Sequence, residues 1–328
     1  MDLIRLPSTF IIMGISEHFY QIDPHHFLSF IEGLGFETTG QVYQLNSYEN
    51  RVFDIFLENQ KRIVAKFYRP ERWTKQSIQQ EHAFSQELAA DGFPIIAPMT
   101  IDGTSVFEWK NMFVAIFPRA AGRNPDEIMP KDFSTLGGYL ARLHNVGAKK
   151  IADQRLTIGA EDFLYPAEGA LQNFVAPEVK NRYFAAVEQI ITYFEERYNP
   201  HRIIRLQGDC HKGNLIHNGE DFVFVDFDDF CNGPAVQDLW MLTYSPDPEE
   251  REENFSALLE GYTKLRDWDE SEEQYIEALR ALRIVHYAGW IARRWQDPHF
   301  PKLFPQFLTY SYWAEEAEAL EKIVWTLE

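Results

Sequence analysis

Residues 206–229 read LQGDCHKGNLIHNGEDFVFVDFDD, and this stretch decides the fold. Within it, Asp209 is followed five residues later by Asn214. A turn then leads into the apolar run 222–225, which is followed directly by Asp226. Because a short apolar run bounded by turn residues is typical of a buried strand, the sequence predicts a loop and a strand that returns Asp226 toward Asp209.

These residue types suit the transfer of a phosphoryl group. The reaction needs a carboxylate that orients the acceptor hydroxyl, and Asp209 is the candidate. It also needs oxygen ligands for Mg²⁺, which Asn214 and Asp226 offer. The order and spacing match the D-x-x-x-x-N catalytic loop and the metal-binding Asp of protein kinases. Asp228 could share the side of Asp226 if the strand continued that far, whereas Asp229 would point away.

A surface hairpin with solubilising acids at its strand ends is the alternative interpretation, and a D-x-x-x-x-N match alone says almost nothing. The surrounding residues favour the catalytic loop. Gly208 and Gly213 permit a tight backbone, His211 lies between them, and the apolar strand directs Asp226 back toward the loop.

The rest of the chain predicts a small sheet followed by helices. The expected strands are 41–45, 51–57, 62–68, 104–109 and 112–117, and the expected helices are 24–34, 74–90, 133–146, 178–198 and 281–295. We therefore predict an α+β, bilobal, protein-kinase-like fold. Its antiparallel-sheet N-terminal lobe is 1–118, including an appended segment 1–22, and its mainly helical C-terminal lobe is 119–328.

Lys66 and Glu81 are expected to form an ion pair at an ATP site. Lys66 interrupts an apolar strand, where a buried ammonium group needs an anion. Glu81 shares a helix face with Phe84 and Leu88, so it points inward. A snorkelling lysine and a solvated glutamate are the alternative for either residue taken alone.

The loop 46–50 occupies the place of the glycine-rich loop of a protein kinase, yet it contains no glycine. Its backbone N–H groups and the Ser47 hydroxyl could bind a phosphate, or the loop could be a plain hairpin turn. The backbone of Ile116 and Phe117 would bind an adenine edge, unless this is an ordinary edge strand.

Two further polar residues lie on expected helices. His144 fits a packed helix residue better than a ligand. Asp238, at the beginning of an apolar helix, could accept hydrogen bonds from the catalytic loop or cap its helix.

Composition excludes several classes of protein. The net charge of −19 argues against a nucleic-acid partner, whose backbone is bound through Lys and Arg. No run approaches the ~20 apolar residues of a membrane span. Two cysteines without zinc spacing fit a reducing cytoplasm.

Between Asp247 and Glu277 twelve carboxylates form an acidic run, which is either a solvated surface or a negative field favouring basic acceptors.

Several longer motifs resemble a known family. The GDCHKGN segment is similar to the G-D-x-H-x-G-N loop of the kinase-like superfamily of aminoglycoside and choline phosphotransferases. The chain more closely resembles the bacterial stress response kinase A family over residues 24–315. The motifs that carry this likeness are LNSYENRV, KFYRPERW, GDCHKGN, VDFDD, NGPAVQDLWM and RRWQDPHFPK.

The resemblance implies an ATP-dependent kinase, active as a cytoplasmic monomer, that phosphorylates Ser and Thr in proteins and acts in stress survival. By motif position, Asp209 is the proton acceptor, Asn214 and Asp226 bind Mg²⁺, and Ser47 lies at the ATP site. The superfamily usually has His where this chain has Gln207, so the hydrogen bond made from that position would differ.

Two other functions stay open at this point. A small-molecule kinase could act on an amino alcohol, a sugar or an aminoglycoside, because a fold does not determine a function. A pseudokinase scaffold would have no need of all five residues Lys66, Glu81, Asp209, Asn214 and Asp226.

Overall fold

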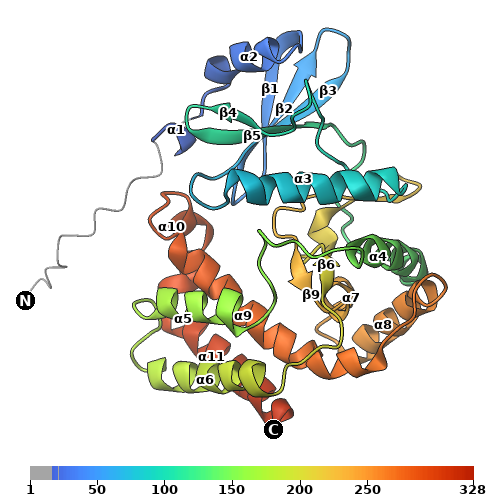
Figure 1. Ribbon diagram of the computed structural model, residues 1–328. Coiled ribbons are helices and arrows are strands. Elements are labelled where there is room, and N and C mark those ends of the chain that lie inside the picture. Colours follow the sequence, from blue (N-terminus) through green and yellow to red (C-terminus); the bar gives the residue numbers. More distant parts are fainter. Residues whose placement is uncertain (1–16, 21) are drawn as a thin grey trace, which may run out of the picture. The chain divides into compact units, whose positions relative to one another are not determined.

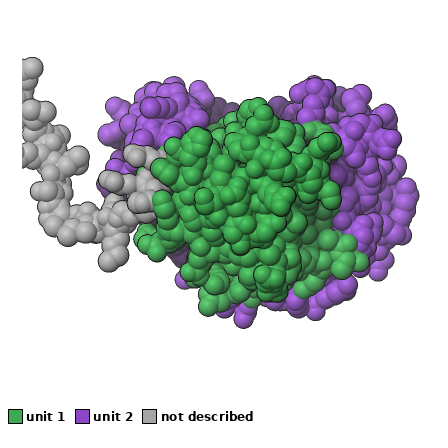
Figure 2. Space-filling model, turned by 90° about the horizontal axis from the view of Figure 1, so that it is seen from above, with its two compact units in different colours: residues 1–90, 95–122 green, residues 91–94, 123–328 purple. Residues whose placement is uncertain are grey.

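The computed structural model describes residues 17–20 and 22–328. The chain forms two compact units, coloured separately in Figure 2. Unit 1 consists of Met1–Ala90 and Ile95–Gly122, and unit 2 of Asp91–Pro94 and Arg123–Glu328. The lobes 1–118 and 119–328 remain a prediction about domain organisation. Most of the appended segment 1–22 lies outside the described residues.

Unit 1 is built on the predicted antiparallel sheet, whose strand order is β1-β2-β3-β5-β4 (Figure 1). Its elements are α1 (Glu17–Tyr20), α2 (Pro24–Gly33), β1 (Thr38–Leu45), β2 (Arg51–Leu57), β3 (Arg62–Phe67), α3 (Lys75–Ala90), β4 (Phe107–Trp109) and β5 (Met112–Pro118). The strand expected at 104–109 is shorter than predicted. Asp102 and Gly103 adopt positive φ angles in a turn that pairs Ile101 with Thr104, and regular pairing begins only at Phe107.

Helix α2 begins as predicted and packs against the sheet. Asp23 caps it by accepting the His25 N–H at 2.9 Å, with Pro24 at the first helical position. Phe27, one turn on, places its ring 4.8 Å from that of Phe53 on β2 and 5.0 Å from that of Phe67 on β3. This aromatic cluster covers the sheet on the side of α2.

Unit 2 is mainly helical, which confirms the α+β class. Its helices are α4 (Phe133–Gly147), α5 (Tyr165–Leu171), α6 (Lys180–Glu196), α7 (Val236–Thr243), α8 (Pro248–Tyr262), α9 (Ile276–Arg293), α10 (Phe300–Leu303) and α11 (Tyr310–Leu327). Its strands are β6 (Ile204–Leu206), β7 (Leu215–His217), β8 (Phe222–Phe224) and β9 (Cys231–Gly233). Short 3₁₀ helices lie at Pro130–Asp132, Lys212–Asn214, Glu270–Tyr275 and Pro305–Leu308, and a π-helical turn at Ala160–Leu164.

Two helix packings position segment 206–229 within unit 2. Helices α5, α6, α9 and α11 (Figure 1) share one large apolar core. In this core the ring centres of Tyr183 and Trp313 lie 5.3 Å apart. Helix α4 packs against α8 and also contacts β6 and α7. Among the described residues, no helix is both long enough and apolar enough to span a bilayer.

A buried histidine of unit 1 provides a pH-dependent test of the fold. His82 on α3 is only 1% exposed, with Nδ1 2.8 Å from Ser105 Oγ and Nε2 3.0 Å from the Tyr68 hydroxyl. Burial, assisted by the positive charge of Lys66, lowers the pKa of His82 from 6.5 to about 3. The unfolded chain therefore binds one proton more than the folded chain between these pH values.

We predict that stability falls as the pH falls below 6.5, by about 1.4 kcal/mol per pH unit from His82 alone. His82→Gln removes this titration. The variant should be less stable than the wild type at pH 7, and the difference should shrink as the pH approaches 4.5. Urea unfolding at a series of pH values measures it, and a constant difference would contradict the buried neutral imidazole.

Candidate functional site

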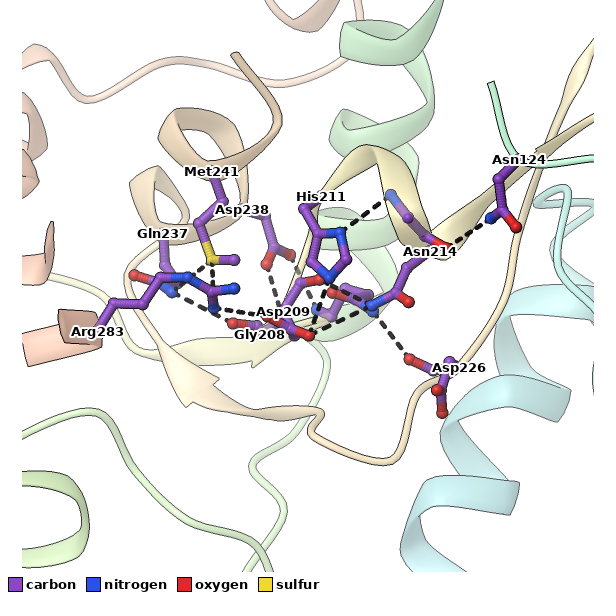
Figure 3. A network of polar contacts seen from close by, with 12 residues as sticks. Asn124, Gly208, Asp209, His211, Asn214, Asp226, Gln237, Asp238, Met241 and Arg283 are labelled. Atoms are coloured by element: carbon purple, nitrogen blue, oxygen red, sulfur yellow. Dashed lines mark hydrogen bonds and ion pairs between the residues drawn. The ribbon is translucent and has the colours of Figure 1, made fainter. Parts of the chain in front are cut away.

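The segment that the sequence predicts to be catalytic, residues 206–229 and here named the catalytic segment, consists of a loop between β6 and β7 followed by the hairpin of β7 and β8. Leu215 pairs with Phe224, and the Val225 N–H donates to the Asn214 carbonyl at 3.0 Å. The hairpin thus brings Asp226 back beside Asn214. Asn214 in turn donates from Nδ2 to the Asp209 carbonyl at 3.0 Å and lies 3.5 Å from Asp209 Oδ2. The structure therefore brings together the three residues that the sequence singled out (Figure 3).

The loop is anchored by the buried carboxylate of Asp238. Its Oδ2 accepts the Gln207 N–H at 2.9 Å and its Oδ1 accepts the Gly208 N–H at 2.8 Å. Asp238 lies in the first turn of α7, and its side chain is fully buried. Of the two roles considered for Asp238, the contact with the loop amides is confirmed. It does not occupy the cap position, because α7 begins at Val236.

His144 supports the same carboxylate from α4. Its Nε2 lies 3.1 Å from Asp238 Oδ2, and its Nδ1 lies 2.9 Å from the Tyr262 hydroxyl on α8. Burial lowers the pKa of His144 although Asp238 opposes the shift, so the ring is neutral. Nε2–H then donates to Asp238, and Nδ1 accepts from Tyr262. His144 is a packed helix residue, as expected, but sequence reasoning missed this polar role.

Gly208 is required by the path of the backbone. Its φ is +83°, and a Cβ there would lie 2.6 Å from the Asp229 carbonyl oxygen and 2.8 Å from Cys231 Sγ. A side chain would clash with both and would also strain the backbone. Burial raises the pKa of the Cys210 thiol well above its ordinary value, so this loop cysteine is a packed residue and not a reactive thiolate.

Asp209 is surrounded by hydrogen-bond donors. Arg283 on α9 donates from Nη1 to Oδ1 at 2.6 Å. The Gly213 N–H donates to His211 Nδ1 at 3.0 Å, so the proton of this imidazole lies on Nε2, 3.3 Å from Asp209 Oδ2. Burial alone would raise the pKa of Asp209, but His211 and Arg283 together lower it to about 2. The carboxylate is therefore ionised, and such a weakly basic group is better suited to orient a hydroxyl than to remove its proton.

Asn214 and Asp226 fit the requirements of a Mg²⁺ site. With Nδ2 of Asn214 turned to the Asp209 carbonyl, Oδ1 of the amide is the atom left to bind a metal. Asp226 is exposed, with φ at +58°. Mg²⁺ usually takes one or two protein carboxylates together with water and phosphate. The described residues accordingly contain no cluster of three His, Cys, Asp or Glu side chains able to hold a metal.

Gln207 contacts both the buried anchor and the Asp226 backbone. Its Nε2 donates to the Asp226 carbonyl oxygen at 2.9 Å, while its own N–H is held by Asp238. The amide thus ties the Asp226 backbone, in its unusual left-handed conformation, to the catalytic loop. Asp228 is buried, and β8 ends at Phe224, so the strand does not continue to Asp228.

In unit 1, Lys66 and Glu81 are both buried, with 7% and 2% of each residue exposed. Lys66 Nζ lies 5.1 Å from the centre of the Tyr68 ring, and the Tyr68 hydroxyl donates to Glu81 Oε1 at 3.2 Å. Both side chains therefore point inward, as the sequence predicted. The ion pair between them stays a prediction.

The glycine-free loop 46–50 is held by two arginines of the KFYRPERW segment. Arg69 donates from Nε to the Glu49 carbonyl at 3.1 Å, and its N–H donates to Asn50 Oδ1 at 3.1 Å. Arg69 and Arg72 also pair with the Glu49 carboxylate at 2.8 and 3.1 Å. Ser47 Oγ accepts the Asn50 N–H at 3.1 Å, which leaves the hydroxyl proton of Ser47 to donate elsewhere. Sequence reasoning missed this clamp, which explains how the loop is shaped without glycine.

Ile116 and Phe117 lie on β5, opposite Ala65 and Val64 of β3. The Ile116 carbonyl accepts the Met99 N–H at 2.7 Å. Their proposed contact with adenine stays a prediction.

Comparison with known proteins identifies relatives over most of the chain. Residues 42–272 match the family described as "APH: Phosphotransferase enzyme family". "Stress response kinase A" of Escherichia coli strain K12 is 37% identical over 275 residues, which are 83% of each protein. "Serine/threonine protein kinase RdoA" of Salmonella typhimurium strain LT2 has the same identity and coverage.

Solved structures show the same fold at lower sequence identity. Amicoumacin kinase hAmiN, in complex with AMP-PNP, Ca²⁺ and Ami, is 18% identical with a TM-score of 0.73, covering 91% of this chain and 93% of its own. A microcompartment-associated aminopropanol kinase is also 18% identical, with a TM-score of 0.72, covering 91% and 98%. These similarities establish an aminoglycoside phosphotransferase-like kinase fold.

We predict that Asp238→Asn loosens the catalytic loop. The amide introduced in this variant must turn its NH₂ toward one of the N–H groups that now donate to Asp238. That buried donor loses its partner, at a cost of ~1–3 kcal/mol. Turnover should fall on the order of 10²-fold, because the reacting groups are no longer held in place. Thermal unfolding and steady-state kinetics measure the two effects.

Asp162→Asn is the matched control, because Asp162, which is only partly buried, also accepts a backbone N–H, that of Thr157 at 2.7 Å. This variant should keep wild-type turnover. Equal effects of the two substitutions would show that the buried anchor has no special role.

Proposed function

The chain belongs to the phosphotransferase enzyme family and, within it, to the stress response kinase A family, and we propose that it transfers the γ-phosphoryl group of Mg-ATP to Ser and Thr hydroxyls of proteins. The observation that carries the proposal is the geometry of Asp209. An ionised carboxylate, held on both oxygens, stands beside the two side chains suited to bind Mg²⁺. This arrangement suits phosphoryl transfer, in which positioning and charge stabilisation supply most of the catalysis.

In the proposed step, Asp209 accepts a hydrogen bond from the acceptor hydroxyl and aims its oxygen at the γ-phosphorus. The new O–P bond forms while the bond from the γ-phosphorus to the β,γ-bridging oxygen breaks. The electron pair of the broken bond leaves with ADP. Because the pKa of Asp209 is about 2, the hydroxyl keeps its proton until the phosphorus–oxygen bond has largely formed, and then releases it through Asp209 to solvent.

The remaining residues bind and orient the nucleotide. Asn214 Oδ1 and the Asp226 carboxylate would hold Mg²⁺, which supplies charge neutralisation at the phosphate oxygens when bound. Lys66, oriented by Glu81, and the Ser47 hydroxyl would contact the phosphates, and the backbone of Ile116 and Phe117 would contact adenine. We further propose that the enzyme acts as a cytoplasmic monomer.

A small-molecule acceptor is the second candidate function. It is favoured by the structural neighbours, which are named for amicoumacin and aminopropanol. Those proteins are only 18% identical and share the fold. A relative that is 37% identical is named a serine/threonine protein kinase, so we propose the protein acceptor.

We predict that Asp209→Asn lowers turnover by more than about 10²-fold, because an amide is a poor acceptor for the hydroxyl proton. Nucleotide affinity and the unfolding temperature should change little. Transfer from γ-labelled ATP to a generic basic protein, and to a panel of amino alcohols and aminoglycosides, measures the effect and identifies the acceptor class. Phosphorylation at the wild-type rate by this variant would overturn the assignment.

Asp226→Ala tests the proposed metal site without relying on turnover. The variant loses an anionic ligand, so Mg²⁺ should no longer tighten ATP binding, whereas ATP alone should bind as to the wild type. Calorimetric titration with and without Mg²⁺ measures the difference. An undiminished effect of Mg²⁺ on ATP affinity would refute the role of Asp226.

A further inference from the structure

Arg283 places a positive charge directly on the proposed acceptor-orienting carboxylate. It is fixed on α9, whose flanking residues Leu282 and Val285 are buried in the core of unit 2. Its Nη1 donates to Asp209 Oδ1 at 2.6 Å and lies 3.8 Å from Met241 Sδ on α7. The established family membership does not account for this contact.

The two oxygens of Asp209 have different surroundings. Oδ2 lies toward His211 and Asn214, on the side of Asp226, whereas Oδ1 lies toward Arg283 and Met241 (Figure 3). If the nucleotide and its metal are bound on the side of Asn214 and Asp226, the acceptor hydroxyl must approach from the side of Oδ1. Arg283 is then the charged group that meets the acceptor.

Arg283 retains donors for a ligand. A guanidinium group has five N–H donors, and within the described part of the chain only Nη1 has a protein partner. The side chain is 38% exposed, so Nε and Nη2 are open to solvent. These two donors form the planar fork that binds carboxylate and phosphate groups.

The neighbouring carboxylate on α9 is already neutralised. Glu277 pairs with Arg280, one turn before Arg283, and the Arg280 guanidinium also lies 5.5 Å from the centre of the Tyr244 ring. An ammonium group arriving beside the hydroxyl would meet the like charge of Arg283, and the carboxylates of Asp209 and Glu277 are already paired with arginines. An anionic group would gain the two open donors.

We propose that Arg283 is an acceptor-recognition residue, and that the acceptor carries a carboxylate or phosphate next to the hydroxyl that is phosphorylated. This inference rests on the proposed function, because it takes Asp209 as the group that orients the acceptor. It names an anionic acceptor, in contrast to amino alcohols and aminoglycosides. The acidic run from Asp247 to Glu277 predicts the opposite preference, for basic acceptors, so one experiment decides between the two.

The test uses three peptides that are identical except for the residues flanking a single Ser, which are Glu, Ala or Lys. Their affinities are measured by calorimetry on the full chain with AMP-PNP and Mg²⁺, and their kcat/KM values with ATP. The wild type should prefer the Glu peptide to the Lys peptide by about 10- to 100-fold, as expected for one charged hydrogen-bonded contact. Arg283→Gln should abolish the preference, and Arg283→Glu should reverse it.

Arg182→Gln is the matched control, because Arg182 pairs with Glu321 between α6 and α11, which carry no residue of the site. It should keep the wild-type preference. All variants should bind AMP-PNP like the wild type, and Arg283→Gln is the variant to rely on if the charge reversal unfolds.

A second arm uses glycerate and ethanolamine, an anionic and a cationic small acceptor, and separates this inference from the proposed function. If glycerate binds in an Arg283-dependent way and no peptide does, Arg283 keeps its role while the protein acceptor fails. If all three peptides are phosphorylated and bind with equal affinity, the proposed protein-kinase function is supported and the inference about Arg283 is overturned. An equal loss of kcat for every acceptor in Arg283→Gln, without a change in acceptor affinity, would also overturn it.

Discussion

The catalytic segment depends on one buried carboxylate. Asp238 accepts the N–H groups of Gln207 and Gly208 and a third hydrogen bond from neutral His144. A buried anion is costly unless it is fully hydrogen-bonded, and here the donors come from two elements of unit 2, the loop after β6 and helix α4. Because the loop is fixed immediately before Asp209, the direction of the Asp209 side chain follows from this anchor. The β7–β8 hairpin then brings Asp226 to the same loop.

The same arrangement determines the chemistry available to the site. Arg283 contacts one oxygen of Asp209 and His211 lies beside the other, and together they keep the carboxylate ionised. An ionised carboxylate of such low pKa favours orientation of a hydroxyl over removal of its proton. Gln207 connects the buried anchor to the residue proposed to bind the metal, since its N–H donates to Asp238 and its side chain donates to the Asp226 carbonyl.

Sequence reasoning found what is encoded by local pattern and missed what depends on long-range packing. Asp209, Asn214 and Asp226 lie within one segment, so spacing and a turn sufficed to bring them together. The sheet of unit 1 and the main helices followed from periodicity, although β4 begins later than predicted and β1 and α9 begin earlier. Arg283 is 74 residues from Asp209, and nothing in its helix distinguishes it from Arg280. The contacts of His144 with Asp238 and Tyr262 likewise depend on α4, α7 and α8 meeting, which no local pattern reports.

The central claim is that the loop is locked by Asp238, and amide hydrogen exchange tests it most directly in the unmodified protein. The account predicts that the N–H groups of Gln207 and Gly208 exchange as slowly as those of the buried helix α4. They should exchange far more slowly than the Glu220 amide in the β7–β8 turn, which donates at 2.9 Å only to the side chain of the exposed Asn218. Exchange of Gln207 and Gly208 at the rate of the Glu220 amide would contradict the account.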